Sequence, residues 1–383
     1  MTIKKIFLSC FLLLIITGSQ QKRPTPQFQK QILDDQVKIG YGLGIGDVDG
    51  DGRVDILLAD KKQFVWYRNP DWQRFVMIDN LTERDNVCLA VRDIDGDGKV
   101  EVAVGAQWNP GETNDEAKSG AVHFLIRPED PTQMWEAIAL HHEPTVHRMR
   151  WVKVGDSYQL VVLPLHGRGN QNGQGQGVRI LAYQVPENPR KTWSYTLLDE
   201  DMHLTHNMDI ISENGTETIL VGGKEGAKIL RQQNGQWPKA GDQGWVIKGH
   251  GFGEIRQHQG FTAGIQPLHG NTLAIYKPGG ERKVLTSSLK EGHALALADL
   301  LSQGQDQIVA GWRKPDAQEE TGIKLFIAND KNWNSWQSVW VDRNGMACED
   351  LKVADLDGDG KKDIIAAGRS THNLVIYWNR SDF

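Results

Sequence analysis

The chain has few cysteines, no block of basic residues and no hydrophobic run long enough to span a bilayer. Only 3 of its 383 residues are cysteines, which is too few for a framework of disulfide bonds. The 43 basic and 49 acidic residues give a net charge of −6, and without a basic block they exclude an electrostatic footprint for nucleic acid. With 39% hydrophobic and 24% charged residues, the composition also excludes long disordered regions.

The N-terminal residues have the pattern of a secretory signal peptide. Two lysines precede an apolar run from Ile6 to Thr17, and Gly18 and Ser19 follow it. Because the run is shorter than the ~20 residues that a bilayer span requires, residues 1–19 are expected to be a signal peptide and the protein to be exported, periplasmic or extracellular, without a stable membrane span. An uncleaved anchor is the alternative. Cys10 only weakly resembles a lipoprotein cleavage site, and the sequence leaves open whether Cys88 and Cys348 pair.

Three segments of the form Asp-x-Asp-Gly-Asp-Gly stand between short apolar runs. Their carboxylates occur at the first, third, fifth and ninth positions around a turn that glycine permits, which is the oxygen ligand set that Ca²⁺ prefers. The flanking runs alternate as strands do, so each segment is expected to be a calcium-binding hairpin loop and not an EF-hand. The candidate calcium ligands are Asp47, Asp49, Asp51 and Asp55; Asp93, Asp95, Asp97 and Glu101; and Asp355, Asp357, Asp359 and Asp363.

The same strand pattern repeats along the chain. An aromatic third strand and a fourth strand led by tryptophan follow each loop, and four strands per repeat is the pattern of a propeller blade. The 41 glycines and 13 tryptophans fit an all-β repeat protein. Seven units are expected to begin near residues 41, 87, 147, 206, 261, 293 and 349. Residues 20–383 are therefore predicted to form one seven-bladed β-propeller, in which a strand near residues 28–33 completes the last blade.

Aligning the first strands places four chemically similar residues at one mouth of the central channel. His147, His206, His293 and Glu349 share this position, while Tyr41, Val87 and Phe261 occupy it in the other three units. Three imidazoles and a carboxylate form a ligand set for Zn²⁺. The alternatives are a polar channel filled with ordered water and a metal-free proton shuttle of neutral imidazoles.

Chain direction places the carboxylate loops on the opposite face and the loops that follow each second strand beside this cluster. These exit loops combine aromatic, basic and amide side chains, which can stack on a sugar and bond to its hydroxyls. They contain Trp108 and Asn109, residues 166–170 with His166 and Arg168, Lys224 and Glu225, Trp312 and Arg313, and residues 369–373 with Arg369 and His372. Arg313 and Arg369 align with each other, so both are expected to reach one pocket.

Several sequence segments between residues 143 and 355 point to one family. They are Glu143-Pro-Thr-Val-His147-Arg-Met-Arg-Trp151, Pro164-Leu-His166-Gly-Arg-Gly, Leu204-Thr-His206-Asn207, Gly292-His293-Ala-Leu, Ala310-Gly-Trp312-Arg313 and Glu349-Asp-Leu-Lys-Val-Ala-Asp355. Over about residues 38–379 the chain resembles the propeller domain of aldos-2-ulose dehydratases. The resemblance implies a catalytic zinc at the bottom of a cleft and dehydration of keto sugars such as 1,5-anhydro-D-fructose. It implies dehydration only, because the cupin domains of full-length members, where a later isomerisation occurs, have no counterpart here.

The resulting hypothesis is a zinc-dependent hydro-lyase acting on a small ketose. Glu349 is either the fourth zinc ligand or the base, His166 and His372 are candidates for the acid, and Arg313 and Arg369 are expected to hold substrate hydroxyls. Two rivals stay open. One is a polysaccharide lyase or glycosidase on an anionic sugar, and the other is a carbohydrate-binding propeller without catalysis.

Overall fold

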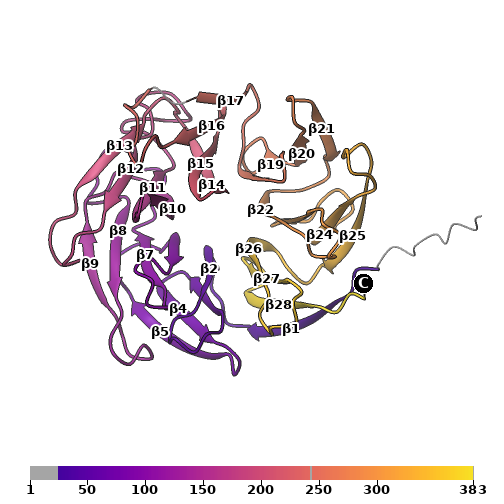
Figure 1. Cartoon of the computed structure of the whole chain (residues 1–383), viewed down its shortest axis with the longest axis horizontal. Coiled ribbons are helices and arrows are strands. Elements are labelled where there is room, and N and C mark those ends of the chain that lie inside the picture. The colour runs from indigo at the N-terminus through magenta and orange to yellow at the C-terminus, as the bar shows by residue number, and fades with distance from the viewer. Residues whose placement is uncertain (1–24, 242–243, 383) are drawn as a thin grey trace, which may run out of the picture.

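The chain forms a ring of β-sheets. The computed structural model describes residues 25–241 and 244–382, and every regular element in those ranges is a β-strand. The strands form seven four-stranded antiparallel sheets around one axis (Figure 1). The predicted seven-bladed, all-β propeller is thereby confirmed. The signal peptide expected at residues 1–19 lies outside the described residues, among which no helix is long and apolar enough to cross a membrane.

Each of the first six blades uses four consecutive strands, which follow one another from the axis outward. Blade one is β2 (Gly42–Gly46), β3 (Asp55–Ala59), β4 (Gln63–Arg68) and β5 (Gln73–Asp79), and blade two is β6 (Cys88–Arg92), β7 (Glu101–Ala106), β8 (Ala121–Ile126) and β9 (Glu136–Leu140). Blade three is β10 (Val146–Val154), β11 (Ser157–Pro164), β12 (Ile180–Gln184) and β13 (Tyr195–Asp199), and blade four is β14 (Thr205–Glu213), β15 (Thr216–Gly223), β16 (Gly226–Arg231) and β17 (Gly244–Lys248). Blade five is β18 (Glu254–His258), β19 (Phe261–Gln266), β20 (Thr272–Tyr276) and β21 (Arg282–Thr286), and blade six is β22 (Gly292–Ala298), β23 (Gln307–Trp312), β24 (Gly322–Ala328) and β25 (Trp336–Arg343).

Blade seven closes the ring with strands from both ends of the chain. It contains β26 (Cys348–Ala354), β27 (Asp363–Gly368), β28 (Asn373–Asn379) and β1 (Phe28–Asp34), and β1 pairs antiparallel with β28. The isolated segment before the first repeat was expected to do this. The pairing covers the outer edge of β28, which would otherwise present unpaired backbone groups.

The start of blade five differs from the sequence alignment. Phe261 lies on the second strand, β19, and the inner strand is β18. The alignment was wrong here because β18 reads Glu254-Ile-Arg-Gln-His258 and lacks the alternating apolar pattern of the other first strands. Charged side chains are accommodated on this strand because an inner strand borders the central channel.

Each inner strand has one edge that faces the axis and pairs with no other strand. Charged side chains form hydrogen bonds with the backbone groups along this edge. Asp350 accepts the N–H of Leu43 at 2.8 Å and of Leu351 at 2.9 Å, and Asp209 accepts the N–H of Gln257 at 3.0 Å. Carbonyls on the same edges accept guanidinium N–H groups of Arg148, Arg150 and Arg256. Buried backbone groups require such partners. The charges around the channel are therefore explained in part by the fold.

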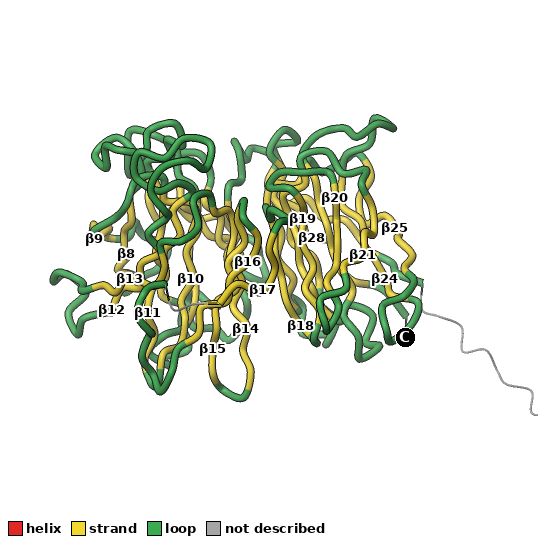
Figure 2. The backbone as a smooth tube through the Cα atoms, turned by 90° about the horizontal axis from the view of Figure 1, so that it is seen from above, coloured by secondary structure: helices red, strands yellow, loops and turns green. Residues whose placement is uncertain are grey.

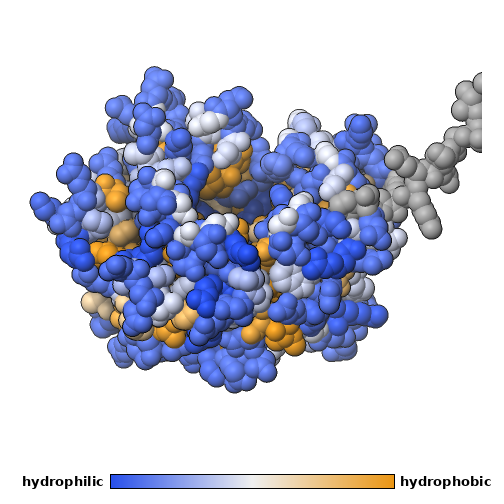
Figure 3. Space-filling model, turned by 60° about the horizontal axis from the view of Figure 1, so that its bottom comes forward, coloured by the Kyte–Doolittle hydropathy of each residue, from blue (hydrophilic) through white to orange (hydrophobic). Residues whose placement is uncertain are grey.

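The two faces of the ring differ. Long loops crowd the face at the top of Figure 2, where second strands end, whereas short hairpins such as β14–β15 project from the other face. Side chains from adjacent blades form the apolar core at each seam, and Trp66 and Trp312 are among the largest that are fully buried. In Figure 3 most of the visible surface is hydrophilic, and its apolar residues form small separate patches. Cys88 and Cys348 are buried free thiols in different blades.

Candidate metal centre

His147, His206, His293 and Glu349 occupy the same backbone position in four blades. The register between each inner strand and its neighbour shifts at these residues, between Val146 and Arg148 in blade three and at the equivalent pairs in blades four, six and seven. A β-bulge leaves its extra residue unpaired and re-aims the side chain. The shared bulge explains why these four residues align in the sequence.

Hydrogen bonds between neighbouring blades orient the histidines. Nδ1 of His147 contacts the carbonyl of His206 at 2.8 Å, Nδ1 of His206 contacts that of Gly253 at 2.7 Å, and Nδ1 of His293 contacts that of Glu349 at 2.6 Å. A carbonyl can only accept, so each Nδ1 carries the proton and each Nε2 keeps its lone pair. Metal-binding histidines are commonly held in this way.

Blade five contributes a histidine by a different route. Its residue in the shared position is Gly253, and a Cβ placed there would lie 2.0 Å from the carbonyl oxygen of Leu268. Glycine therefore lets the loop between β19 and β20 approach the axis. This loop carries His269, whose ring lies beside those of His206 and His293. Blade five, which has a glycine in the shared position, thus supplies a histidine from a loop.

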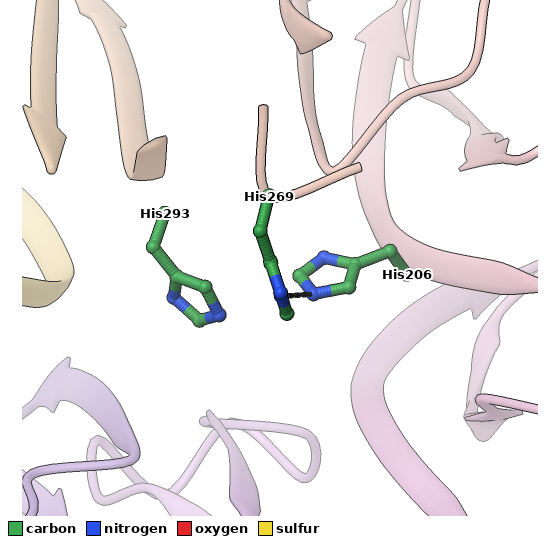
Figure 4. Close-up of side chains that lie close together, drawn as sticks. All are labelled: His206, His269 and His293. Carbon is green, nitrogen blue, oxygen red and sulfur yellow. Dashed lines mark hydrogen bonds between the residues drawn. The ribbon is translucent and has the colours of Figure 1, made fainter. Parts of the chain in front are cut away.

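The three imidazoles converge on one space (Figure 4). Nitrogen atoms of His206, His269 and His293 all lie within 4.8 Å of one another, and Nε2 of His206 contacts Nε2 of His269. Burial first, and neighbouring positive groups second, hold the pKa values of His206 and His293 well below their usual range. Desolvation and Arg313 lower the pKa of His269 to about 4, although its outer edge is exposed. All three rings are neutral at pH 7, which is the form that binds metal.

His147 was predicted as a zinc ligand, but the structure places it outside this group. Its ring lies against His206 with centroids 4.6 Å apart, and Trp108 stacks on it at 5.1 Å. Nε2 of His147 accepts a hydrogen bond from the Arg148 guanidinium at 3.2 Å, so its lone pair is engaged. The geometry favours His269 over His147 as the third ligand.

Glu349 is held by the two arginines that were aligned with each other. Arg369 contacts its Oε1 at 3.0 Å and Arg313 contacts its Oε2 at 3.3 Å. The carboxylate is not part of the three-histidine group among the described residues. Burial raises the pKa of Glu349, and the two guanidinium groups oppose this shift. The carboxylate is therefore more basic than an ordinary surface carboxylate while keeping two donors.

The other candidates at the mouth are placed differently. His166 is half-buried and its Nδ1 has no partner within the described parts of the chain. His372 is exposed, and its Nδ1 bonds to the carbonyls of Val37 and Lys38, so it faces the segment before β2. Trp312 was expected at the rim but is 1% exposed in the core, where it bonds to the carbonyl of Glu320. The register of β23 turns this side chain into the seam between blades.

The three carboxylate loops fold alike. In the first, Asp47 accepts the N–H groups of Gly50 and Gly52 at 2.6 and 2.7 Å, and the other two loops repeat this pattern. Carboxylates gather in each loop, and the close groups are Asp47, Asp49 and Asp55; Asp93, Asp95 and Glu101; and Asp355, Asp357 and Asp359. The candidates Asp51, Asp97 and Asp363 lie outside them. Asp363 instead accepts the N–H groups of Leu356 and Asn379, so it clamps the loop.

Sequence reasoning missed His269 and Gly253. A signal for His269 is present, because Pro267-Leu268-His269-Gly270 repeats the tetrapeptide Pro164-Leu165-His166-Gly167, and both follow a second strand. Gly253 carries no local signal. Its role depends on the approach of a loop that the pattern of one strand does not encode.

Replacing Gly253 by alanine is expected to damage the centre. The added methyl would displace the Leu268 carbonyl and with it His269, so the three imidazoles would no longer converge. The zinc content of the purified variant is expected to fall below that of the wild type, measured by metal analysis. Gly244→Ala is the matched control because a Cβ there meets nothing within 4 Å. Unchanged zinc content in Gly253→Ala would contradict the role assigned to the loop.

The comparisons with known proteins agree with this fold. Residues 119–278 match the family described as "Aldos-2-ulose dehydratase, beta-propeller domain", a segment that includes His147, His206 and His269. The chain carries a propeller of the aldos-2-ulose dehydratase type. Residues 47–104 match an FG-GAP-like repeat and residues 89–125 an FG-GAP repeat, which places two of the carboxylate loops in this dehydratase-type propeller within repeats of that kind.

Solved structures resemble the dehydratase-type propeller in fold alone. The structure of BBS1N in complex with ARL6DN, soaked with mercury, is 13% identical with a TM-score of 0.58, covering 94% of this chain and 98% of that one. A chain of the Mitotic Checkpoint Complex is 9% identical with a TM-score of 0.57, covering 98% and 99%. No curated protein matches the sequence.

Proposed function

We propose that this protein is an exported, zinc-dependent hydro-lyase that dehydrates a small keto sugar. The observation that carries the proposal is the convergence of His206, His269 and His293 near Glu349, whose backbone carbonyl bonds to Nδ1 of His293 and whose side chain is buried. The similarity to the dehydratase propeller supports the substrate class. A binding protein without catalysis has no need for neutral imidazoles gathered next to a basic carboxylate.

The three histidines fit zinc by their chemistry. Their rings are neutral, two of them have Nδ1 fixed by a carbonyl, and three protein nitrogens with an open fourth position are the ligand set of a catalytic zinc. This assignment replaces His147 by His269 and leaves Glu349 free for another role. Zinc bound there would polarise the carbonyl of the ketose and stabilise the charge that develops on its oxygen.

Glu349 is assigned as the base. Its carboxylate takes the proton from the carbon next to the carbonyl, the carbon–carbon double bond forms, and the neighbouring carbon–oxygen bond breaks. The same carboxyl group then returns the proton to the departing hydroxyl, which leaves as water. The raised pKa of Glu349 favours the first transfer.

The remaining side chains position the substrate. Arg313 and Arg369 hold the carboxylate from opposite oxygens, and the Nε of Arg313 is buried without a partner among the described residues, so it is available to a substrate hydroxyl. Burial lowers the pKa of His166, which is therefore neutral near pH 7 and a weak acid. We assign it a hydrogen-bonding role. His372 is assigned none because its Nδ1 bonds to the backbone.

Calcium in the three carboxylate loops completes the proposal. Asp47, Asp93 and Asp355 lead the loops and would anchor the ions, on the face opposite the histidines. Blade six offers an internal comparison, because Asp299 and Gln307 hold a loop of the same kind through backbone N–H groups with fewer carboxylates. The loop shape thus does not require an ion, and we assign calcium a stabilising role.

An ultraviolet assay tests the reaction. 1,5-Anhydro-D-fructose or a related 2-keto sugar should lose water to give an absorbing enone, and removal of zinc should stop the reaction. A uronate polysaccharide serves as the comparison substrate. Absorbance that grows only with the polymer and survives zinc removal would move the assignment to a polysaccharide lyase. If neither substrate reacts and the protein binds no zinc, the assignment would move to a carbohydrate-binding propeller without catalysis.

The Glu349→Gln variant distinguishes a role of Glu349 as the base from a role as a zinc ligand. We expect kcat to fall by about 100-fold to 10,000-fold, the usual contribution of a general base, while KM changes little. Zinc content should stay at the wild-type value because the carboxylate lies outside the histidine group. Loss of zinc in this variant would instead identify Glu349 as a ligand.

A further inference from the structure

A pocket lies on the face opposite the histidine centre, at the seam where blade seven meets blade one. Its volume is about 590 Å³, which falls within the range of small-molecule pockets. Trp72 and Trp378 line it with their rings 6.2 Å apart and tilted by 54°. Arg53 and Asp357 belong to the carboxylate loops that border it. The pocket is thus aromatic on one side and polar on the other.

The floor of this pocket belongs to the fold. Asn69 donates two hydrogen bonds, to the carbonyl of Leu356 in blade seven at 2.7 Å and to that of Val54 at 3.1 Å. Asn379 makes the equivalent pair of bonds, to Leu300 and Lys362, at the seam of blades six and seven. The hydrogen bonds that form the floor of the pocket are therefore repeated at another seam between blades and belong to the fold. The two tryptophans are an addition at the seam of blades seven and one.

Trp72 is placed unlike its counterparts in other blades. Trp135 and Trp193 lead the fourth strands of blades two and three, are each 4% exposed, and donate Nε1–H to a proline carbonyl. Pro131 lies four residues before Trp135, whereas Pro70 lies only two residues before Trp72. The shorter turn leaves Trp72 half-buried on the pocket, with no partner for its Nε1 in the described parts of the chain.

The backbone gives no reason for a tryptophan at this position. Trp72 has φ 56°, in the left-handed region that favours glycine or asparagine, and a bulky residue there costs free energy. The indole packs only at the margin of the apolar cluster between blades one and seven. Trp333 of blade six has a similar φ of 57° but packs against Phe261, so it is the place of Trp72 on the pocket that indicates a function of the ring.

We propose that this pocket binds a neutral hexopyranose unit of an oligosaccharide or polysaccharide. The indole of Trp72 would cover the apolar face of the sugar, and Nε1–H of Trp72 and the guanidinium of Arg53 would bond to its hydroxyls. A uronate is disfavoured because the basic side chains near the pocket already have acidic partners: Arg53 lies 4.0 Å from Asp51, and Arg380 donates to Asp357 at 2.8 Å. The site is independent of the proposed dehydration, since it lies on the opposite face and shares no residue with the histidine centre.

Calorimetric titration with cellohexaose, maltohexaose and laminarihexaose tests this site, with hexagalacturonate as the charged comparison. At least one neutral hexasaccharide is expected to bind, and Trp72→Asn should weaken it by about tenfold or more. Asparagine tolerates the left-handed φ, so the melting temperature should not fall. Tyr195→Ala, which removes an exposed aromatic ring of blade three, is the control and should bind the hexasaccharide as the wild type does. Dehydration of the small ketose should be unchanged in Trp72→Asn.

Three outcomes would overturn the proposal. They are no binding of any neutral hexasaccharide, equal binding by the wild type and Trp72→Asn, and preferred binding of hexagalacturonate. A lower melting temperature of Trp72→Asn with unchanged binding would show that the ring only packs the seam. Because the ketose assay is read separately, failure of this site and failure of the proposed dehydration are distinguishable.

Discussion

His206→Ala is expected to lose bound zinc and dehydratase activity together. The ring of His206 lies between those of His147 and His293 and contacts His269 directly, so no other side chain takes its place. A metal ion that polarises a carbonyl contributes several kcal/mol, which corresponds to about 1,000-fold or more in rate. Metal analysis of the purified variant and the ultraviolet assay measure the two losses.

Two further variants distinguish the ligand sets. His269→Ala should lose zinc as His206→Ala does, whereas His147→Ala should keep it, because Nε2 of His147 is bonded to Arg148. Melting temperatures should change little in all three variants, since the rings line the channel mouth and not a seam core. Full zinc content in both His206→Ala and His269→Ala would refute the assigned centre. Loss of zinc in His147→Ala with retention in His269→Ala would restore the set predicted from sequence.

Removal of calcium is expected to lower the melting temperature by about 10 °C or more before activity is lost. An ion that binds only the folded state adds about 2.7 kcal/mol at a hundredfold excess over its dissociation constant, and three loops would together add about 8 kcal/mol. This is a large share of the roughly 5–15 kcal/mol that stabilises a folded protein. Calorimetric melting after dialysis into calcium-free buffer, with zinc kept at its working concentration, measures the effect.

The loop of blade six provides the control for this experiment. Ser302→Ala changes a loop that has few carboxylates, and the dependence of its melting temperature on calcium should equal that of the wild type. Asp47→Asn removes a carboxylate that leads a candidate site and should reduce the dependence. A wild-type melting temperature that does not respond to calcium would show that the three loops are held by their backbone hydrogen bonds alone.

The sequence by itself determined the propeller. The spacing of the loops around Asp47, Asp93 and Asp355 marked the hairpins, and the alternating strands around them predicted four strands per blade and seven blades. The sequence also placed His206 and His293 at equivalent positions of their blades, and equivalent positions of the inner strands meet at the axis. The strand β18 departs from this pattern, since its side chains border the channel and do not alternate.

Only the tertiary structure showed which histidines lie close together in the candidate centre. His269 reaches the axis from a loop because Gly253 leaves room for Leu268, a contact between residues that neither strand pattern relates. His147 and Glu349 lie at the equivalent positions of their blades. Their side chains, however, accept hydrogen bonds from Arg148 and from Arg313 and Arg369, respectively. Sequence periodicity specifies which backbone positions face the axis, whereas the partners of a side chain depend on distances between blades. For this reason the repeat could be predicted from the sequence, whereas the grouping of the three histidines could not.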